Sequence, residues 1–176
     1  MQSLIVDVPD FPIPGITFKD FSKVWSDAAL CKKMLVAMSD SIRLSGTTVD
    51  YVMGVESRGF IFGMAMAMEL GVPFVPVRKK GKLPGATVEA SFALEYGQAT
   101  IECQSAAIGK QGRVLIHDDV LATGGTAAAA ASVVQKLGGE VIGYSFLMEL
   151  GFLRGGQRLS DQTPDAFIHS LISIDS

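Results

Sequence analysis

The chain has 176 residues, of which 48% are hydrophobic and 19% are charged, and its formal net charge is −3. This length and apolar content suffice for one core, so we expect a single domain over residues 1–176. A slightly acidic chain has no overall basic field for nucleic acid, and any positive patch must be local. Two cysteines are too few for a disulfide framework or a metal cluster, and we expect buried or half-buried thiols.

No apolar stretch is long enough for a membrane span, and the first residues lack the basic and apolar regions of a secretory signal. We therefore expect a cytoplasmic protein whose partners are small molecules, with no nucleic acid and no membrane among them.

The N-terminal arm, residues 1–25, contains an aromatic segment that is rich in proline. Residues 9–21 hold three prolines, one glycine and three phenylalanines, which disfavours both a helix and a central strand. One interpretation is an arm that packs on the core. The other is a base-binding wall, with aromatic faces for stacking and backbone groups left to recognise a heterocycle.

Strands and helices alternate after this arm. Apolar residues recur at helical spacing from an N-cap at Ser26 or Asp27 to Ile42, and Gly46 ends this predicted helix. The next predicted elements are a buried strand over residues 49–55, a helix over 60–70 that Gly71 ends, and a strand over 72–77.

Four cations lie among flexible residues in the segment 78–85, Arg-Lys-Lys-Gly-Lys-Leu-Pro-Gly. Such runs are usually solvated basic loops. In an otherwise slightly acidic chain, the same concentration of charge suggests a mobile hood that closes over a polyanion. Residues 89–94 and 98–103 alternate in polarity and predict a hairpin with its turn near Gly97.

Residues 113–126 read as a strand, a loop of small residues and the start of a helix. Asp118 and Asp119 follow the apolar run 114–116, and adjacent carboxylates need a cation or hydroxyl groups as partners, such as magnesium or a sugar. The amides of 122–126 would lie at a helix N-terminus and favour a phosphate. The alternative is a glycine turn with two solvated acids.

The rest of the chain predicts a helix over 126–137, a strand over 140–147, and a tail rich in loops with a last strand within 166–174. His117 and His169 are expected to be packed strand residues. The alternation predicts an α/β fold with a mainly parallel sheet flanked by helices. Loops 56–59, 78–85 and 118–126 should share one edge and suit a ligand with a sugar and two phosphate groups.

The run HDDVLATGGT resembles the ribose-phosphate signature of the type I phosphoribosyltransferases. Four further motifs, in the family's order, resemble its adenine-specific branch: FPIPGITFKD, GVESRGFIFG, RKKGKLPG and LEYG. The resemblance extends from Phe11 to about Leu150. The chain departs from the pattern at His117, where an apolar residue is usual.

This resemblance implies the type I phosphoribosyltransferase fold, Mg²⁺ as cofactor, a homodimer, and conversion of adenine and phosphoribosyl pyrophosphate to AMP and pyrophosphate in purine salvage. The implied ribose-5-phosphate residues are Asp118, Asp119, Ala122, Thr123, Gly124, Gly125 and Thr126. The implied pyrophosphate residues are Ser57, Arg58, Lys79 and Lys82, and the implied adenine residues are Thr17, Phe18, Lys19, Glu95 and Val120. Glu95, Arg58, Asp118 and Asp119 would be catalytic, no residue would bind the metal directly, and the Glu56–Ser57 peptide would be cis.

Two other functions remain open. The 6-oxopurine phosphoribosyltransferases share the central signature, but they resemble one another in using a lysine after it, and this chain has no lysine after Lys136. A sensor that binds phosphoribosyl pyrophosphate without catalysis would need an attached nucleic-acid-binding segment, and none is recognisable.

Overall fold

The computed structural model of the chain describes residues 2–11, 13–93 and 98–175. Internal contacts divide the chain into two compact units, Met1–Ala37 and Met38–Ser176, and each is described by itself. No helix in the described ranges combines the length and the apolar character that a membrane crossing requires.

The first unit contains the predicted aromatic segment. Its elements are η1 (Gln2–Leu4), β1 (Val6–Val8), β2 (Phe18–Asp20), α1 (Ser22–Trp25) and the start of α2 (Ala28–Leu44). β1 and β2 pair antiparallel, and the rings of Phe11 and Phe18 meet edge to face at 5.2 Å. The Asp27 carboxylate accepts a hydrogen bond from the Leu30 amide at 2.9 Å, which confirms Asp27 as the N-cap of α2.

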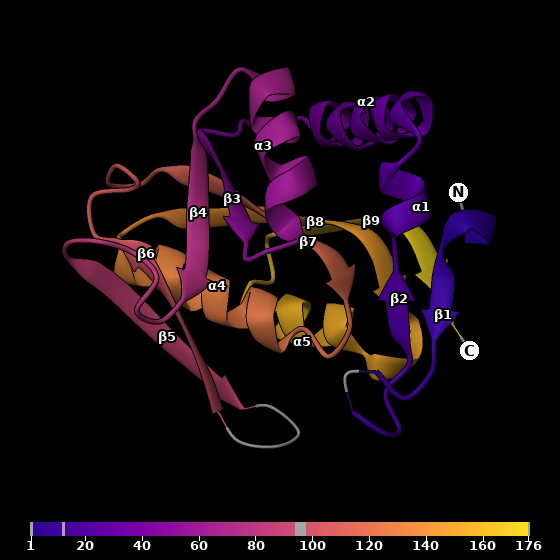
Figure 1. The fold of residues 1–176 in the computed structure, drawn as a ribbon. Helices are drawn as coiled ribbons and strands as arrows, with labels where there is room; N and C mark the ends of the chain where they lie inside the picture. Colours follow the sequence, from indigo (N-terminus) through magenta and orange to yellow (C-terminus); the bar gives the residue numbers. More distant parts are fainter. Residues whose placement is uncertain (1, 12, 94–97, 176) are drawn as a thin grey trace. The chain divides into compact units, whose positions relative to one another are not determined.

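The second unit is built on a seven-stranded sheet with the order β5-β6-β4-β3-β7-β8-β9 (Figure 1). The pairs β3–β4, β3–β7, β7–β8 and β8–β9 are parallel, whereas β6 pairs antiparallel with both β4 and β5. The strands are β3 (Tyr51–Val55), β4 (Phe74–Lys79), β5 (Thr87–Ala93), β6 (Gln98–Gln104), β7 (Arg113–Leu121), β8 (Glu140–Leu150) and β9 (Phe167–Ile174).

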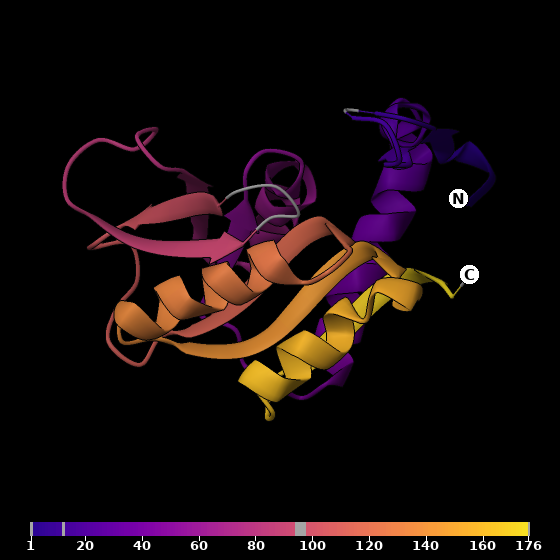
Figure 2. The ribbon, with the colours of Figure 1, turned by 90° about the horizontal axis from the view of Figure 1, so that it is seen from below.

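Helices cover both faces of this sheet. In Figures 1 and 2, α3 (Gly59–Leu70) lies on one face, and α4 (Gly125–Lys136) and α5 (Gly155–Gln162) lie on the other. The alanine run of α4 is buried against the sheet, where small side chains permit a close approach of helix and strands. The central strands β3, β7 and β8 are therefore buried on both faces, as their continuous apolar sequences predict.

The predicted fold class, the antiparallel pairing of the two hairpin strands and the glycine helix ends are confirmed, while the predicted turn near Gly97 lies outside the described residues. Gly71 and Gly138 follow α3 and α4 with φ of 71° and 79°, the left-handed conformation that glycine adopts without penalty. Cys103 is buried and Cys31 is half-buried, as expected.

Two expectations about local structure are wrong. The tail was predicted as loops, but residues 155–162 form α5, which is held by the packing of the buried Leu159 and has almost no apolar stripe of its own. The acid pair was predicted after a short strand. It lies within β7, because pairing with β8 continues as far as Leu121 opposite Glu149.

His117 is a buried strand residue, as predicted. Its exposed fraction is 0%, and burial lowers the pKa of the imidazole to about 4. A methyl group placed at Gly63 of α3 would lie 3.5 Å from His117 Cδ2, so the ring packs beneath that helix. The imidazole is therefore neutral near pH 7.

Candidate active site

Three loops lie at one edge of the sheet. β4, β3 and β7 are neighbours and run parallel, so the segments that follow them emerge side by side at their carboxyl ends. These segments are 56–58, 80–86 and 122–124, which correspond to the three loops expected to share a ligand.

The loop after β3 is joined to both of its neighbours by carboxylate contacts. Arg78 Nη2 donates to Glu56 Oε1 at 2.9 Å, and the Lys79 amide donates to Glu56 Oε2 at the same distance. On the other side, Arg58 Nε lies 2.7 Å from Asp119 Oδ2. The Glu56–Ser57 peptide is cis, as the resemblance implied.

The acid pair Asp118–Asp119 lies at the end of β7. Asp119 is buried, with 4% of its surface exposed, and its amide donates to Asp118 Oδ1 at 2.9 Å. Burial raises the pKa of Asp118 well above its ordinary value, and the neighbouring Asp119 raises it further. Burial also raises the pKa of Asp119, while Arg58 opposes that rise. Arg58 therefore favours the charged form of Asp119.

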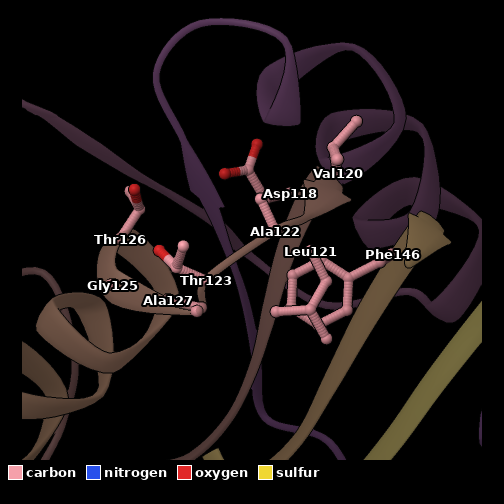
Figure 3. A pocket seen from close by; sticks show the side chains of 10 residues that line it. Asp118, Val120, Leu121, Ala122, Thr123, Gly125, Thr126, Ala127 and Phe146 are labelled. Carbon is pink, nitrogen blue, oxygen red and sulfur yellow. The ribbon is translucent and has the colours of Figure 1, made fainter. Parts of the chain in front are cut away.

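The loop after the acid pair forms a cradle at the start of α4. Gly124 has a φ of 74°, and the first intrahelical bond runs from the Ala128 amide to the Gly124 carbonyl at 2.9 Å. The amides of the first helical turn are left for a ligand. Figure 3 shows Asp118 from β7, with Thr123 and Thr126 from the loop and helix, lining one pocket. The pocket is lined by Asp118, Val120, Leu121, Ala122, Thr123, Gly124, Gly125, Thr126, Ala127 and Phe146.

The four cations of the hood segment differ in their partners. Arg78 is paired with Glu56, and Lys80 Nζ lies 2.7 Å from Glu89 Oε2. Among the residues that the structure describes, Lys79 and Lys82 have no ion pair, and both are exposed. These two lysines are the ones assigned to pyrophosphate by the resemblance.

Sequence reasoning missed the two glutamates that hold the hood segment. Besides Glu56, the buried Glu102 of β6 accepts hydrogen bonds from the Lys82 and Leu83 amides at 2.9 and 2.8 Å. These bonds lower the pKa of Glu102, the Leu83 amide most strongly. Glu102 lies in the polar phase of the alternation over 98–103, so the sequence alone does not distinguish it from a solvated acid.

The residues expected to bind adenine belong to both units of the chain, and one of them lies outside the described residues. Phe18 and Lys19 form part of β2 in the first unit, preceded by Thr17, and Lys19 Nζ lies 2.7 Å from Asp7 Oδ1. Val120 lines the pocket beside Asp118 in the second unit. Glu95 lies outside the described residues, as does the rest of the LEYG motif.

Comparison with known proteins identifies the family. The phosphoribosyl transferase domain model matches residues 28–175. The adenine phosphoribosyltransferase of Cytophaga hutchinsonii is 49% identical over 160 residues, which cover 91% of this chain and 87% of that protein. The crystal structure of the Thermoanaerobacter pseudethanolicus adenine phosphoribosyltransferase matches with a TM-score of 0.92 and 42% identity, over 98% of this chain and 97% of that one.

A third match carries a ligand. The Giardia lamblia enzyme, solved in complex with 9-deazaadenine, matches with a TM-score of 0.90 and 37% identity over 99% of this chain and 96% of that one. Relatives at this identity, matched over most of both chains, share the fold described above. The chain belongs to the adenine phosphoribosyltransferase family.

Proposed function

We propose that the residues at the carboxyl edge of β3, β4 and β7 carry out the family's reaction, in which adenine and phosphoribosyl pyrophosphate give AMP and pyrophosphate. The observation that carries this proposal is the arrangement of charge along the edge. The acid pair, of which Asp119 is buried, is followed by a helix N-terminus, and Arg58 and the cationic segment 78–85 follow the neighbouring strands β3 and β4. A substrate with a ribose, a 5′-phosphate and a pyrophosphate group matches all three.

The pyrophosphate end of the substrate is assigned to Ser57, Arg58, Lys79 and Lys82. Negative charge develops on the leaving pyrophosphate as its bond to the anomeric carbon breaks, and fixed cations stabilise that charge. Lys79 and Lys82 support this role because neither forms an ion pair with another described residue. The bond from adenine to the anomeric carbon forms as the bond to pyrophosphate breaks, with no covalent enzyme intermediate.

The ribose is assigned to Asp118 and Asp119. Their carboxylates can accept hydrogen bonds from two hydroxyls, and their charge can stabilise the positive charge that develops on the ribose ring. The pair is costly while it is buried without such partners, as the raised pKa of Asp118 indicates. The 5′-phosphate is assigned to the amides and hydroxyls of residues 122–126.

Adenine is assigned to Thr17, Phe18, Lys19 and Val120, the residues that the resemblance implies. Support for adenine as the base comes from the Giardia lamblia enzyme, whose complex contains 9-deazaadenine. Glu95 would approach the imidazole nitrogen of adenine that is not ribosylated and favour the reactive tautomer. This role depends on the LEYG motif alone.

Mg²⁺ is the proposed cofactor. The donors available at the edge are carboxylate oxygens, which suit this hard cation, and Mg²⁺ commonly keeps several waters and binds through substrate phosphates. Because Asp119 already pairs with Arg58, we expect substrate oxygens and water to hold the ion, with little direct coordination by that carboxylate. When bound, the ion would neutralise charge on the pyrophosphate group.

A homodimer in the cytoplasm completes the proposal. α3 carries Ile61, Met64 and Met68 at helical spacing, with exposed fractions of 48%, 48% and 72%. An apolar stripe of this kind suits a self-complementary interface. Both cysteines are unpaired thiols, which fits a reducing compartment.

Nucleotide formation from adenine, hypoxanthine and guanine in parallel, with phosphoribosyl pyrophosphate and magnesium present, tests this function. We expect product from adenine alone. Asp119→Asn should lower kcat/KM by about a hundredfold or more, because the charge opposite the reacting ring is lost. Glu95→Gln should also lower it, while Glu69→Gln, on the surface of α3, should not. Product mainly from hypoxanthine or guanine would overturn the assignment of adenine.

A further inference from the structure

The helix α5 packs directly against the loop that is assigned to the 5′-phosphate. A methyl group placed at Gly155 would lie 2.2 Å from the Ala122 carbonyl oxygen and 3.0 Å from the Gly124 nitrogen. A methyl group at Gly124 would in turn lie 2.9 Å from the Gly155 carbonyl oxygen. Only glycine at both positions permits this close approach, and it fixes the first turn of α5 beside the phosphate loop.

One turn further along α5, Arg158 reaches the first residue of α4. A methyl group placed at Gly125 would lie 3.6 Å from Arg158 Nη1 and 3.7 Å from Thr123 Oγ1. Gly125 and Thr123 both line the pocket at the start of α4. The guanidinium group is therefore close to the N-terminal end of α4, where the helix has unpaired N–H groups.

This position is electrostatically unfavourable for a cation unless an anion is present. The N-terminus of a helix carries a partial positive charge, and a guanidinium beside it is repelled. The ion pairs of the described residues do not include Arg158, and the residue is exposed. Glu149 is the carboxylate at the same end of α5, beside Gly156, and it makes no ion pair with Arg158. A bound phosphate would be attracted both to the guanidinium group and to the helix N-terminus, and it would offset the repulsion between them.

We propose that Arg158 is a further phosphate-binding residue, which contacts the 5′-phosphate of phosphoribosyl pyrophosphate and AMP together with the amides of 123–126. The proposal rests on the assignment of this loop to the 5′-phosphate and adds a residue outside the family's sequence motifs. Arginine suits the role because its planar group offers five donors to phosphate oxygens.

The test compares ligands that do and do not carry a 5′-phosphate. Arg158→Gln should raise the KM for phosphoribosyl pyrophosphate and the inhibition constant of AMP by about five- to tenfold, the loss of one charge-assisted hydrogen bond. The inhibition constant of inorganic pyrophosphate and kcat should change less than twofold, because neither involves the 5′-phosphate. Arg158→Lys should recover part of the affinity, since it keeps the charge without the fork.

Binding of ribose 5-phosphate, measured by calorimetry, gives a readout that does not depend on catalysis. The affinity should fall about five- to tenfold in Arg158→Gln and stay unchanged in Lys110→Gln, which removes an exposed cation from the loop before β7, at the opposite end of that strand. Unchanged ribose 5-phosphate binding in Arg158→Gln would overturn the proposal. If the wild type bound ribose 5-phosphate more tightly than Arg158→Gln but formed no AMP, the proposed function would fail and this role of Arg158 would stand.

Discussion

At the scale of single residues, similar side chains in one loop have different partners and should contribute differently to catalysis. Lys79, Lys80 and Lys82 are indistinguishable by residue type, but among the described residues only Lys80 has an ion-pair partner, Glu89. An exposed pair of this kind contributes little to stability, so its main effect is to make Lys80 less available to another anion. The lysines without an ion pair among the described residues are the ones available to an incoming pyrophosphate group.

The lysines therefore provide a matched comparison. Lys82→Gln should raise the KM for phosphoribosyl pyrophosphate by about tenfold, because one cation near the leaving group is lost. Lys80→Gln, two residues away with the same change of charge, should change it less than twofold. Steady-state kinetics at constant ionic strength measures both, and equal effects would show that the loop acts only through its total charge.

His117 should make the stability of the protein depend on pH. Its pKa in the folded state is about 4, compared with 6.5 for an unperturbed imidazole, so the unfolded chain binds a proton that the folded chain excludes. Stability should therefore fall as the pH drops from about 6.5 towards 4. At pH 5 the loss attributable to His117 is about 2 kcal/mol.

The buried acid pair has the opposite dependence, since its raised pKa values favour the folded state at low pH. The measurement must therefore be a difference between proteins. Urea unfolding of the wild type and of His117→Leu, each at pH 7 and pH 5, isolates the histidine. The wild type should lose about 2 kcal/mol more than the variant on this change of pH. Equal losses of stability in the two proteins would mean that the imidazole can be protonated in the folded state.

At the scale of elements, the loop proposed to bind the 5′-phosphate depends on the close approach of α5 to the start of α4. Gly124 needs both its positive φ and the absence of a side chain, because a methyl group would meet the Gly155 carbonyl oxygen at 2.9 Å. Gly138 has a φ of 79° but nothing within 4 Å of the same methyl position. Substitutions at these two glycines therefore separate the effect of backbone conformation from the effect of packing.

We expect Gly138→Ala to lower the free energy of unfolding by about 1 kcal/mol, the penalty for a residue other than glycine in the left-handed conformation. Gly124→Ala should lower it by about 1–3 kcal/mol more, since the added methyl group also forces α5 away. Denaturant unfolding measures both, and only Gly124→Ala should raise the KM for phosphoribosyl pyrophosphate. A similar KM in the two variants would mean that the close packing of α5 against this loop does not affect substrate binding.

At the scale of the whole molecule, the exposed apolar stripe of α3 should determine the oligomeric state. This stripe belongs to the helix whose first residues follow Arg58, so an interface there would also restrain the loop after β3. Met68 is the most exposed of its three residues, at 72%. A charge at such a position inside an interface would be desolvated without a partner.

Met68→Glu should therefore dissociate the proposed dimer, or weaken it by at least a hundredfold, because the buried charge costs several kcal/mol. Light scattering coupled to size-exclusion chromatography measures the mass directly. Phe152→Glu, at an exposed apolar residue outside α3, is the matched control and should leave the mass unchanged. A wild-type protein that is monomeric at micromolar concentration would remove the basis for the proposed dimer.

Much of the fold could be predicted from local patterns. Glycines at 71 and 138 end helices because the left-handed conformation suits them, and Asp27 begins α2 because its carboxylate satisfies an unpaired amide. α5 could not be predicted in this way. Its sequence has two glycines in the first turn and one buried apolar residue, so its stability comes from contacts with distant residues.

The sequence by itself determined the strands and helices with strong patterns, the acid pair, the glycine-rich loop and the cationic segment, because these depend on neighbouring residues. Only the tertiary structure decided which charges meet. Arg58 pairs with Asp119, 61 positions away along the chain, and Glu56 pairs with Arg78, because β3 lies between β4 and β7 in the sheet. Strand order depends on the packing of the whole core, and no local pattern records it.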